Sequence, residues 1–251
     1  MQIAIEGLSV HFKNADGSAL AALGPLSVTI DSGSFVALLG PSGCGKSTLV
    51  RTVAGLQQAT TGTVHIGDRL VTEPMDGIVL MFQDANLMPW RTVRDNIALP
   101  LELNFVPKPE RYQRVASLLP LLGLEDFAES YPSELSGGMA QRAALGRVLI
   151  QNPDVVLLDE PFGALDAMTR EKISLDLLRL WTRYQETVLM VTHDINEAVL
   201  LADRILILSQ RPGQIIGDIT VPLDRPRTLD MVYTQPFIET AREVRETIDR
   251  A

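Results

Sequence analysis

Nine residues near the start of the chain combine glycine, lysine and serine in a spacing that suits phosphate chemistry. The stretch GPSGCGKST, residues 40 to 48, follows an apolar run and fits the pattern G-x-x-x-x-G-K-[ST]. Glycines permit a backbone path that aims successive N–H groups at phosphates, the lysine would neutralise β and γ oxygens, and the serine hydroxyl would ligate Mg²⁺. A glycine-rich turn with a surface lysine is the alternative. We predict a nucleoside triphosphate site made by Gly40, Pro41, Ser42, Gly43, Cys44, Gly45, Lys46, Ser47 and Thr48, with Lys46 catalytic and Ser47 a metal ligand.

A second anion-binding pattern, SELSGGMAQRAAL, occupies residues 133 to 145 at the expected start of a helix. The Ser136 hydroxyl can donate, Gly137 and Gly138 let the backbone come close, and unpaired N–H groups point outward from a helix end. One domain does not need two phosphate cradles. The residues alone therefore leave open whether this triplet holds an anion or is an ordinary glycine-rich helix N-terminus.

Further reactive side chains follow apolar runs, namely Gln83, the pair Asp159 and Glu160, and His193. A carboxylate at the end of a strand can hold the water shell of a metal ion, which suits Asp159. A second carboxylate one residue on points elsewhere and can polarise an attacking water, which suits Glu160 as general base. His193 could donate to a γ-phosphate. Taken singly, each could instead be a capping, loop or structural residue, so the prediction depends on their coincidence.

The elements that must position these groups are four short apolar runs at 35–39, 78–82, 155–158 and 188–192. The runs are continuous rather than alternating, which is typical of strands covered on both faces of a parallel sheet. Helical patterns separate them, so we expect the α/β class. Ligands of open α/β sheets bind beyond the carboxyl ends of the strands, which would gather the four endings around one site.

Two other segments have helical patterns. Residues 90–147 contain no clear strand, and we interpret them as a helical lobe inserted into the sheet domain. In the tail, apolar residues recur at helical spacing, and we expect this stripe to pack on the body of the chain. It consists of Phe237, Ile238, Ala241, Val244 and Ile248.

Composition limits the classes of function. The net charge of −9 argues against sequence-independent binding of nucleic acid, which needs a basic face. Cys44 is the single cysteine, so no intrachain disulfide can form and a reducing compartment fits. The N-terminus has no secretory pattern, and no window reaches the roughly 18 apolar residues that a spanning helix needs. Any membrane role must therefore come through a partner.

Together, GPSGCGKST, Gln83, LSGGM, VVLLDEP, ALD at residues 164–166 and His193 resemble the ATPase subunit of an ATP-binding cassette (ABC) transporter, over nearly the whole chain. The resemblance implies a P-loop NTPase core with a mainly parallel sheet, an N-terminal antiparallel β portion and the inserted lobe. It also implies a head-to-tail dimer in which Ser136, Gly137 and Gly138 grip the γ-phosphate of ATP held by a second copy. The expected cofactors are ATP and Mg²⁺.

By the same resemblance, Phe12 takes the place of the aromatic residue that stacks on adenine, although a buried strand phenylalanine is the alternative. Gln83 matches the glutamine that senses metal and γ-phosphate, so we expect it to be both catalytic and metal-binding, with Asp159 as a further metal ligand. Asp166 matches the aspartate that communicates across the dimer. The common signature reads LSGGQ, whereas Met139 stands here in place of the glutamine.

The stretches FQDANLMPWRTVRDNIALPLE, ALDAMTR and RPGQI resemble importer ATPases of the nitrate, sulfonate and taurine group, whose relatives also serve uptake of bicarbonate and thiamine precursors. This implies a separate multi-spanning permease, indirectly a solute-binding protein, and a peripheral position on the cytoplasmic face of the membrane. Trp90 would lie near the groove for a coupling helix of the permease, or pack inside the lobe. The alternative function is a soluble ABC ATPase acting as a mechanical or regulatory module.

We expect one ABC ATPase domain over residues 1–251. Residues 1–89 and 148–220 would form its nucleotide-binding core, residues 90–147 its helical signature lobe, and residues 221–251 a helical tail.

Overall fold

Six strands form the central sheet of the computed structural model, which describes residues 1–13, 17–163, 166–184 and 186–250. The strand order is β10-β9-β3-β8-β7-β6, and every neighbouring pair is parallel except β9 and β10. The six strands are β3 (Phe35–Leu39), β6 (Ile78–Met81), β7 (Val155–Asp159), β8 (Thr187–Val191), β9 (Arg204–Leu208) and β10 (Ile215–Thr220). All residues of β3, β7 and β8 are buried, which explains their continuous apolar runs. The predicted mainly parallel sheet is confirmed.

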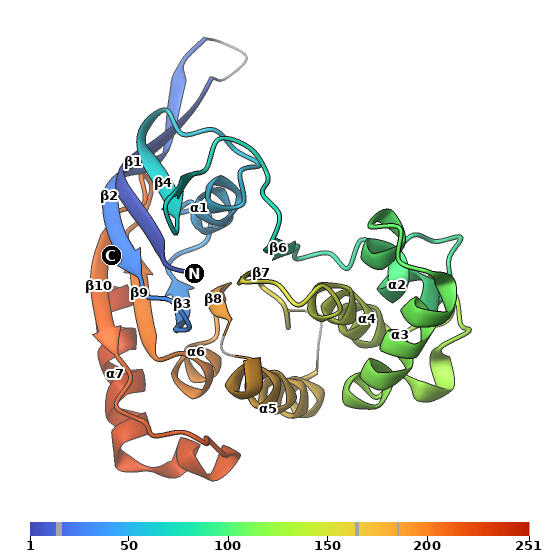
Figure 1. The fold of residues 1–251 in the computed structure, drawn as a ribbon. Coiled ribbons are helices and arrows are strands. Elements are labelled where there is room, and N and C mark those ends of the chain that lie inside the picture. The colour runs from blue at the N-terminus through green and yellow to red at the C-terminus, as the bar shows by residue number, and fades with distance from the viewer. Residues whose placement is uncertain (14–16, 164–165, 185, 251) are drawn as a thin grey trace.

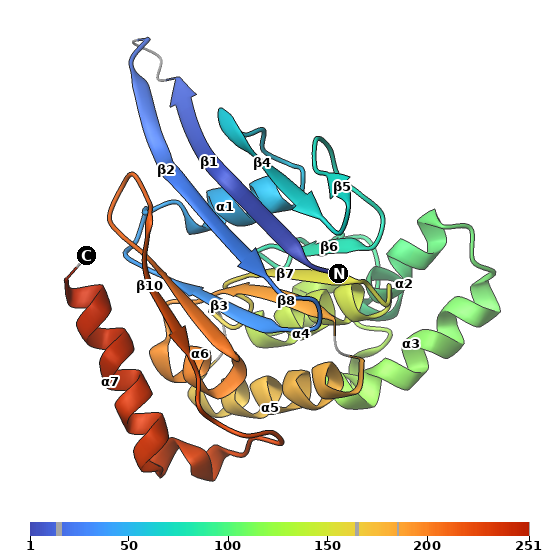
Figure 2. The ribbon, with the colours of Figure 1, turned by 60° about the vertical axis from the view of Figure 1, so that its left-hand side comes forward.

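A second, antiparallel sheet covers one face of the core in the order β2-β1-β4-β5 (Figure 2). Its strands are β1 (Ile3–Lys13), β2 (Ala19–Ile30), β4 (Thr61–Ile66) and β5 (Arg69–Leu70). Helix α1 (Lys46–Val53) shares one hydrophobic cluster with both sheets. Alternate residues of β3 divide between the two faces: Val36 and Leu38 join that cluster, whereas Phe35 and Ala37 join the cluster under the other helices.

A helical lobe projects to one side of the core, in green to olive-yellow in Figure 1. It consists of α2 (Val93–Leu103), α3 (Lys108–Leu122), the 3-10 turns η1 (Glu125–Phe127) and η2 (Pro132–Glu134), and α4 (Gly137–Leu149). No strand lies within residues 90–147, all of which the structure describes. Helix α4 runs back from the lobe toward the sheet and contacts β6, so it connects the two parts.

The remaining helices cover the other face of the central sheet and its β9–β10 edge (Figures 1 and 2). They are α5 (Ala167–Tyr184), α6 (Ile195–Leu201), η3 (Leu229–Tyr233) and α7 (Gln235–Asp249). Helix α7 packs on β9, β10 and α6. Phe237 and Val244 are buried and Ala241 and Ile248 partly buried, as the stripe predicted, but the prediction is wrong for Ile238, which is 41% exposed at the edge of the apolar face. No helix of the described segments is long and apolar enough to cross a membrane.

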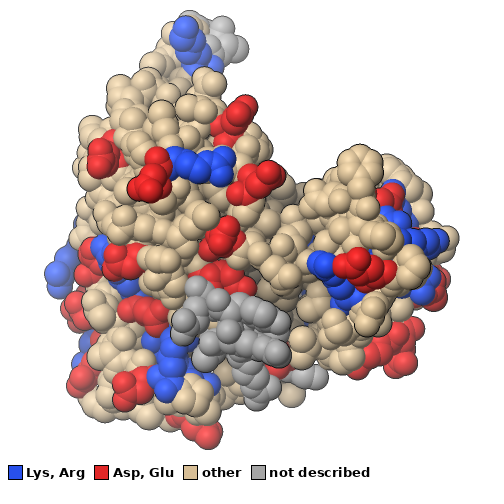
Figure 3. All heavy atoms as spheres, viewed as in Figure 1, with Lys and Arg blue, Asp and Glu red and all other residues tan. Residues whose placement is uncertain are grey.

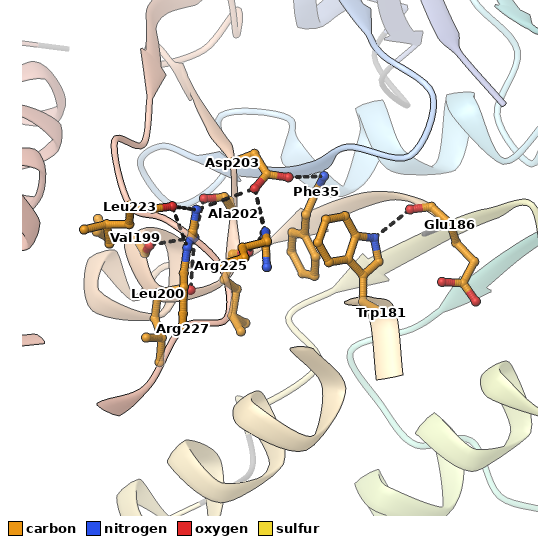
Figure 4. Close-up of polar contacts among 11 residues, drawn as sticks. Phe35, Trp181, Glu186, Val199, Leu200, Ala202, Asp203, Leu223, Arg225 and Arg227 are labelled. Carbon is orange, nitrogen blue, oxygen red and sulfur yellow. Dashed lines mark hydrogen bonds and ion pairs between the residues drawn. The ribbon is translucent and has the colours of Figure 1, made fainter. Parts of the chain in front are cut away.

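One buried cation fixes the C-terminal end of α6 (Figure 4). The side chain of Arg227 is 1% exposed and donates to carbonyl oxygens that the end of a helix leaves without intrahelical partners. Its acceptors are the carbonyls of Val199, Leu200 and Ala202, at 2.7 to 3.2 Å, and of Leu223. Burial lowers the pKa of Arg227 to about 10, so the guanidinium stays charged at neutral pH. The tail is therefore tied to α6 by hydrogen bonds as well as by packing.

A second contact joins the tail to the central sheet and to α5 (Figure 4). Asp203 accepts from the guanidinium of Arg225 at 2.7 Å and from the backbone N–H of Phe35 at 3.0 Å. The Arg225 guanidinium lies 4.1 Å from the centre of the Trp181 ring, and that ring meets Phe35 edge-on at 5.7 Å. Polar and aromatic contacts thus hold the tail, β3 and α5 in one arrangement.

Candidate nucleotide-binding site

The loop between β3 and α1 has a backbone that only glycine tolerates easily. Gly45 caps the N-terminus of α1 with φ +108°, in the region that other residues rarely adopt. A Cβ atom there would lie 2.8 Å from the carbonyl oxygen of Ala22 and 2.6 Å from a methyl carbon of Leu23. The close approach of β2 and this φ value together require glycine.

The lysine of the loop folds back across it. The Nζ atom of Lys46 donates to the carbonyl oxygens of Gly40 at 2.8 Å and Pro41 at 2.9 Å. Lys46 is only 8% exposed, so these carbonyls satisfy a cation that has lost most of its water. Its ammonium group is held at the cavity wall, where it can meet an anion.

A cavity of about 650 Å³ opens over this loop and collects most of the predicted site residues. Its walls come from β1, β2, the glycine loop and the ends of three central strands. The lining residues are Phe12, Leu20, Ala22, Gly40, Ser42, Gly43, Gly45, Lys46, Ser47, Thr48, Gln83, Glu160, His193 and Arg211. Pro41 and Cys44 belong to the same loop without lining the cavity, and the Cys44 thiol is buried.

Ser47 lines the cavity, and Asp159, which does not line it, lies buried directly behind Ser47; together they offer hard oxygen ligands. The Ser47 hydroxyl donates to Oδ1 of Asp159 at 3.0 Å. Asp159 is 3% exposed, and burial raises its pKa, an effect that the hydrogen bond from Ser47 partly offsets. The described residues contain no cluster of three or more His, Cys, Asp or Glu side chains for a metal. A single carboxylate with a hydroxyl fits Mg²⁺, which takes its remaining ligands from water and phosphates.

Three side chains from three strand ends converge above that pair. Oε2 of Glu160 lies 3.4 Å from Nε2 of Gln83 and 3.3 Å from Nδ1 of His193. Glu160 has φ +49°, an unusual value for a residue other than glycine, and its N–H donates to the carbonyl of Val191 at 3.0 Å. Such backbone strain concentrates at functional sites, and here it turns the Glu160 carboxylate toward the cavity.

The second glycine motif does start a helix but does not line the cavity. Ser136 is the N-cap of α4, and its Oγ accepts from the N–H of Met139 at 3.2 Å. Ser136 and Gly137 are exposed, and Gly138 is partly exposed. The Met139 side chain packs against the hydrophobic core of the lobe.

Asp166 also lies outside the cavity, and it caps the start of α5. Its Oδ1 accepts from the N–H of Thr169 at 3.0 Å, and hydrogen bonds from Thr169 lower the pKa of Asp166. The other two residues of the predicted ALD motif, Ala164 and Leu165, lie outside the described residues.

Comparisons with known proteins identify the family of this chain. Residues 23–163 match the model of the family described as ABC transporter. The chain belongs to the ABC transporter family. It is 44% identical over 223 residues to the nitrate import ATP-binding protein NrtD of Synechocystis sp., covering 89% of this chain and 84% of that protein. It is 40% identical over 220 residues to the taurine import ATP-binding protein TauB of Roseobacter denitrificans, covering 88% of this chain and 82% of that protein.

A solved structure of the same family has the same fold. It is a dimeric, post-hydrolysis state of the ATP-binding cassette MJ0796 bound to ADP and Pi, with a TM-score of 0.79 and 32% identity over 88% of this chain and all of that chain. The predicted family, its ATP-hydrolysing cassette and its α/β fold are thereby confirmed.

The exposure of two aromatic residues of this ABC cassette decides between alternatives that the sequence left open. Phe12 is 38% exposed and lines the cavity, so the interpretation as a buried strand phenylalanine is wrong. Trp90 is 71% exposed, so ordinary packing inside the lobe is also wrong. The surface is hollowed between the core and the lobe, over β6, α2 and α4, where a groove of about 590 Å³ lies (Figure 3).

Three residues that line the cavity or support its walls were not predicted from the sequence. Arg211 lines the cavity and donates to the carbonyl of Gly43 at 3.0 and 3.1 Å. From α4, buried Gln141 donates to the carbonyl of Gln83 at 3.1 Å, and Arg147 donates to the backbone just beyond it. These are bonds from side chains to a distant backbone, which no spacing motif encodes, although Arg211 belongs to the RPGQI stretch.

Proposed function

We propose that this protein is the ATP-hydrolysing subunit of an importer for a small solute of the nitrate, sulfonate or taurine type, or of the thiamine-precursor type. The observation that carries ATP hydrolysis is the convergence of Gln83, Glu160 and His193 over the glycine loop, beside a hydroxyl–carboxylate pair. The similarity to nitrate and taurine import ATP-binding proteins supports the role in import. When bound, ATP with Mg²⁺ would supply the phosphoryl group that passes to water and the cation that neutralises its charge.

We assign each of these residues a role in ATP binding or hydrolysis that agrees with its contacts. The glycine loop and Lys46 would hold phosphate oxygens, and Ser47, Asp159 and Gln83 would hold the metal and its water shell. Glu160 accepts the proton of an attacking water as general base. His193 would donate to the γ-phosphate, and its contact with Glu160 would orient that carboxylate. Phe12 offers an exposed aromatic face at the cavity wall for the adenine ring.

A second copy of the chain completes the site. Ser136, Gly137 and Gly138 are anion-binding groups at a helix N-terminus that cannot serve their own cavity, because they lie outside it. Their availability supports a head-to-tail dimer in which each triplet grips the γ-phosphate held by the partner, with Asp166 near the same interface. Charge-assisted hydrogen bonds to that phosphate would hold the two copies together until hydrolysis removes it. The MJ0796 cassette is dimeric in its own structure.

The groove between the core and the lobe is the surface we assign to the permease. Its lining combines apolar residues of β6, α2 and α4 with polar side chains, among them Asp84, Asn104 and Arg147. Trp90 lies exposed on the loop before α2. A short amphipathic helix of a membrane subunit would place its apolar face there. The protein would then lie peripherally on the cytoplasmic face of the membrane, and a solute-binding protein would act on the permease from the other side. Nucleic acid has no role in this proposal.

The domain limits proposed from the sequence accompany this assignment: a core of 1–89 and 148–220, a lobe of 90–147 and a tail of 221–251 in a single domain. Purification from membranes under gentle detergent tests the transport role. We expect a multi-spanning protein to co-purify, and liposomes with that complex and its solute-binding protein to take up solute only with ATP. Recovery with soluble or nucleic-acid partners alone would instead favour a mechanical or regulatory ATPase.

A further inference from the structure

Glu197 is a buried carboxylate that the proposed chemistry does not use, and it lies four residues after His193. It is 8% exposed, in the first turn of α6. Its Oε2 accepts a short hydrogen bond from the hydroxyl of Thr192, which is 2% exposed. The same hydroxyl accepts from the N–H of Asp194 at 3.0 Å. The residues on both sides of His193 are therefore tied, through one hydroxyl, to the carboxylate of Glu197.

Burying the Glu197 carboxylate at this position costs free energy of folding. Burial raises the pKa of Glu197 to about 7, and the negative charges of Asp194 and Glu160 act in the same direction. The hydrogen bond from Thr192 and the charge of Arg170 act against them. The other oxygen, Oε1, is buried and has no hydrogen-bond partner among the described residues. An apolar side chain would avoid this cost, so the carboxylate needs a reason other than stability.

The helix that carries Glu197 is fixed at both ends. At its start, Asp194 caps the helix by accepting from the N–H of Glu197 at 3.1 Å, and it also binds Arg170 of α5 at 3.0 Å. At its end, Arg227 holds the last carbonyls (Figure 4). The side chain of His193 is itself 61% exposed, so little packing orients its ring. The orientation of the His193 ring therefore depends on the backbone at residues 192–194.

We propose that Glu197 is a positioning residue for His193, acting through the hydroxyl of Thr192. By accepting from that hydroxyl, the carboxylate fixes the turn between β8 and α6 against a rigid helix and keeps the His193 ring within reach of Glu160 and the cavity. The inference rests on the proposed role of His193 at the γ-phosphate. A misplacement of a reacting group by about 1 Å costs on the order of 100-fold in rate.

Matched variants of the full chain test the inference. Thr192→Val removes the hydroxyl at constant shape, and Glu197→Leu removes the acceptor, whereas Thr192→Ser and Glu197→Gln keep the hydrogen bond. Thr240→Val is the control, because Thr240 is equally buried and its hydroxyl binds a carbonyl within α7, far from the cavity. In single-turnover hydrolysis, we expect Thr192→Val and Glu197→Leu to lower the rate roughly 10- to 100-fold with little change in the ATP concentration for half-saturation. The other three should keep the rate.

A second measurement needs no activity. The chain has three histidines, so the His193 ring gives one of only three sets of imidazole proton signals in an NMR spectrum of the nucleotide-free protein. We expect those signals to move in Thr192→Val and Glu197→Leu, and to stay in place in Glu197→Gln and Thr240→Val. Unchanged signals and rates in both disrupting variants would overturn the inference, as would equal losses in Glu197→Gln and Glu197→Leu.

A double variant separates this inference from the proposed function. His193→Ala should lower the rate by itself, and adding Thr192→Val should then cost nothing more, because the hydroxyl acts only through His193. A full additional loss in the double variant would refute the positioning role while leaving His193 catalytic. A normal rate in His193→Ala would refute the proposed role of His193, and the inference with it.

Discussion

Glu197 should make the stability of the protein fall as the pH rises through neutrality. Its pKa is about 7 in the folded chain, against an ordinary value of 4.5, with burial as the main cause. Between these values the folded state binds more protons than the unfolded state, so unfolding becomes easier as the pH increases. The contribution is fully present below pH 4.5 and is lost as the pH passes 7. At 1.36 kcal/mol per pKa unit, the difference amounts to about 3 kcal/mol.

Urea unfolding of the wild type and of Glu197→Gln at a series of pH values isolates this contribution. The glutamine stays neutral, so the variant should gain about 3 kcal/mol relative to the wild type between pH 4.5 and pH 8. Glu243→Gln, on the exposed face of α7, is the control and should track the wild type. A constant free-energy difference between the wild type and Glu197→Gln at all pH values would refute the reasoning, because it would mean that Glu197 ionises alike in both states.

Three further predictions concern the core, the glycine loop and α4. Trp181→Ala should lower the free energy of unfolding by about 3–5 kcal/mol, because the buried ring packs edge-on against Phe35; denaturant unfolding measures it. Gly45→Ala should weaken ATP binding by at least about 10-fold in calorimetry, because φ +108° disfavours a side chain. Gln141→Met should slow hydrolysis several-fold, and less than additively with Gln83→Ala, because Gln141 holds the backbone of Gln83.

A specific result would refute each of these three predictions. If Trp181→Phe destabilised the protein as much as the alanine variant, the loss would not come from ring packing. Gly163→Ala should keep ATP affinity, because a Cβ there meets only ordinary contacts; equal losses at Gly45 and Gly163 would refute the backbone explanation. Fully additive losses for Gln141→Met and Gln83→Ala would show that Gln141 acts independently of Gln83.

The sequence predicted the central sheet well because burial on both faces leaves a simple pattern. The run at 35–39 matches β3, and the other three runs match β6, β7 and β8 to within one residue. The polar residues that follow these strands come together because parallel strands share one carboxyl edge. The continuous apolar runs and the polar residues that follow them were therefore enough to predict the central sheet and the side of the cavity that the strand ends form.

What the sequence could not predict depends on contacts between distant segments. Arg227 resembles any other tail arginine until the fold brings it to the end of α6, and Gln141 resembles any other polar helix residue until it meets the backbone of Gln83. The exposure of a side chain also depends on distant segments: Ile238 fits the apolar stripe of α7 by spacing, yet its side chain is 41% exposed. Trp90 likewise fits burial by residue type, but the loop before α2 leaves it exposed.

The most direct test of the central claim, that two copies share each nucleotide, is the size of Glu160→Gln in solution. This variant should bind ATP without hydrolysing it, so light scattering after size exclusion should give a dimer with ATP and Mg²⁺ and a monomer without them. Adding Ser136→Arg should abolish the dimer while ATP still binds, because the second copy loses its grip on the phosphate. A monomer of Glu160→Gln with ATP bound, or a dimer that survives Ser136→Arg, would contradict the claim.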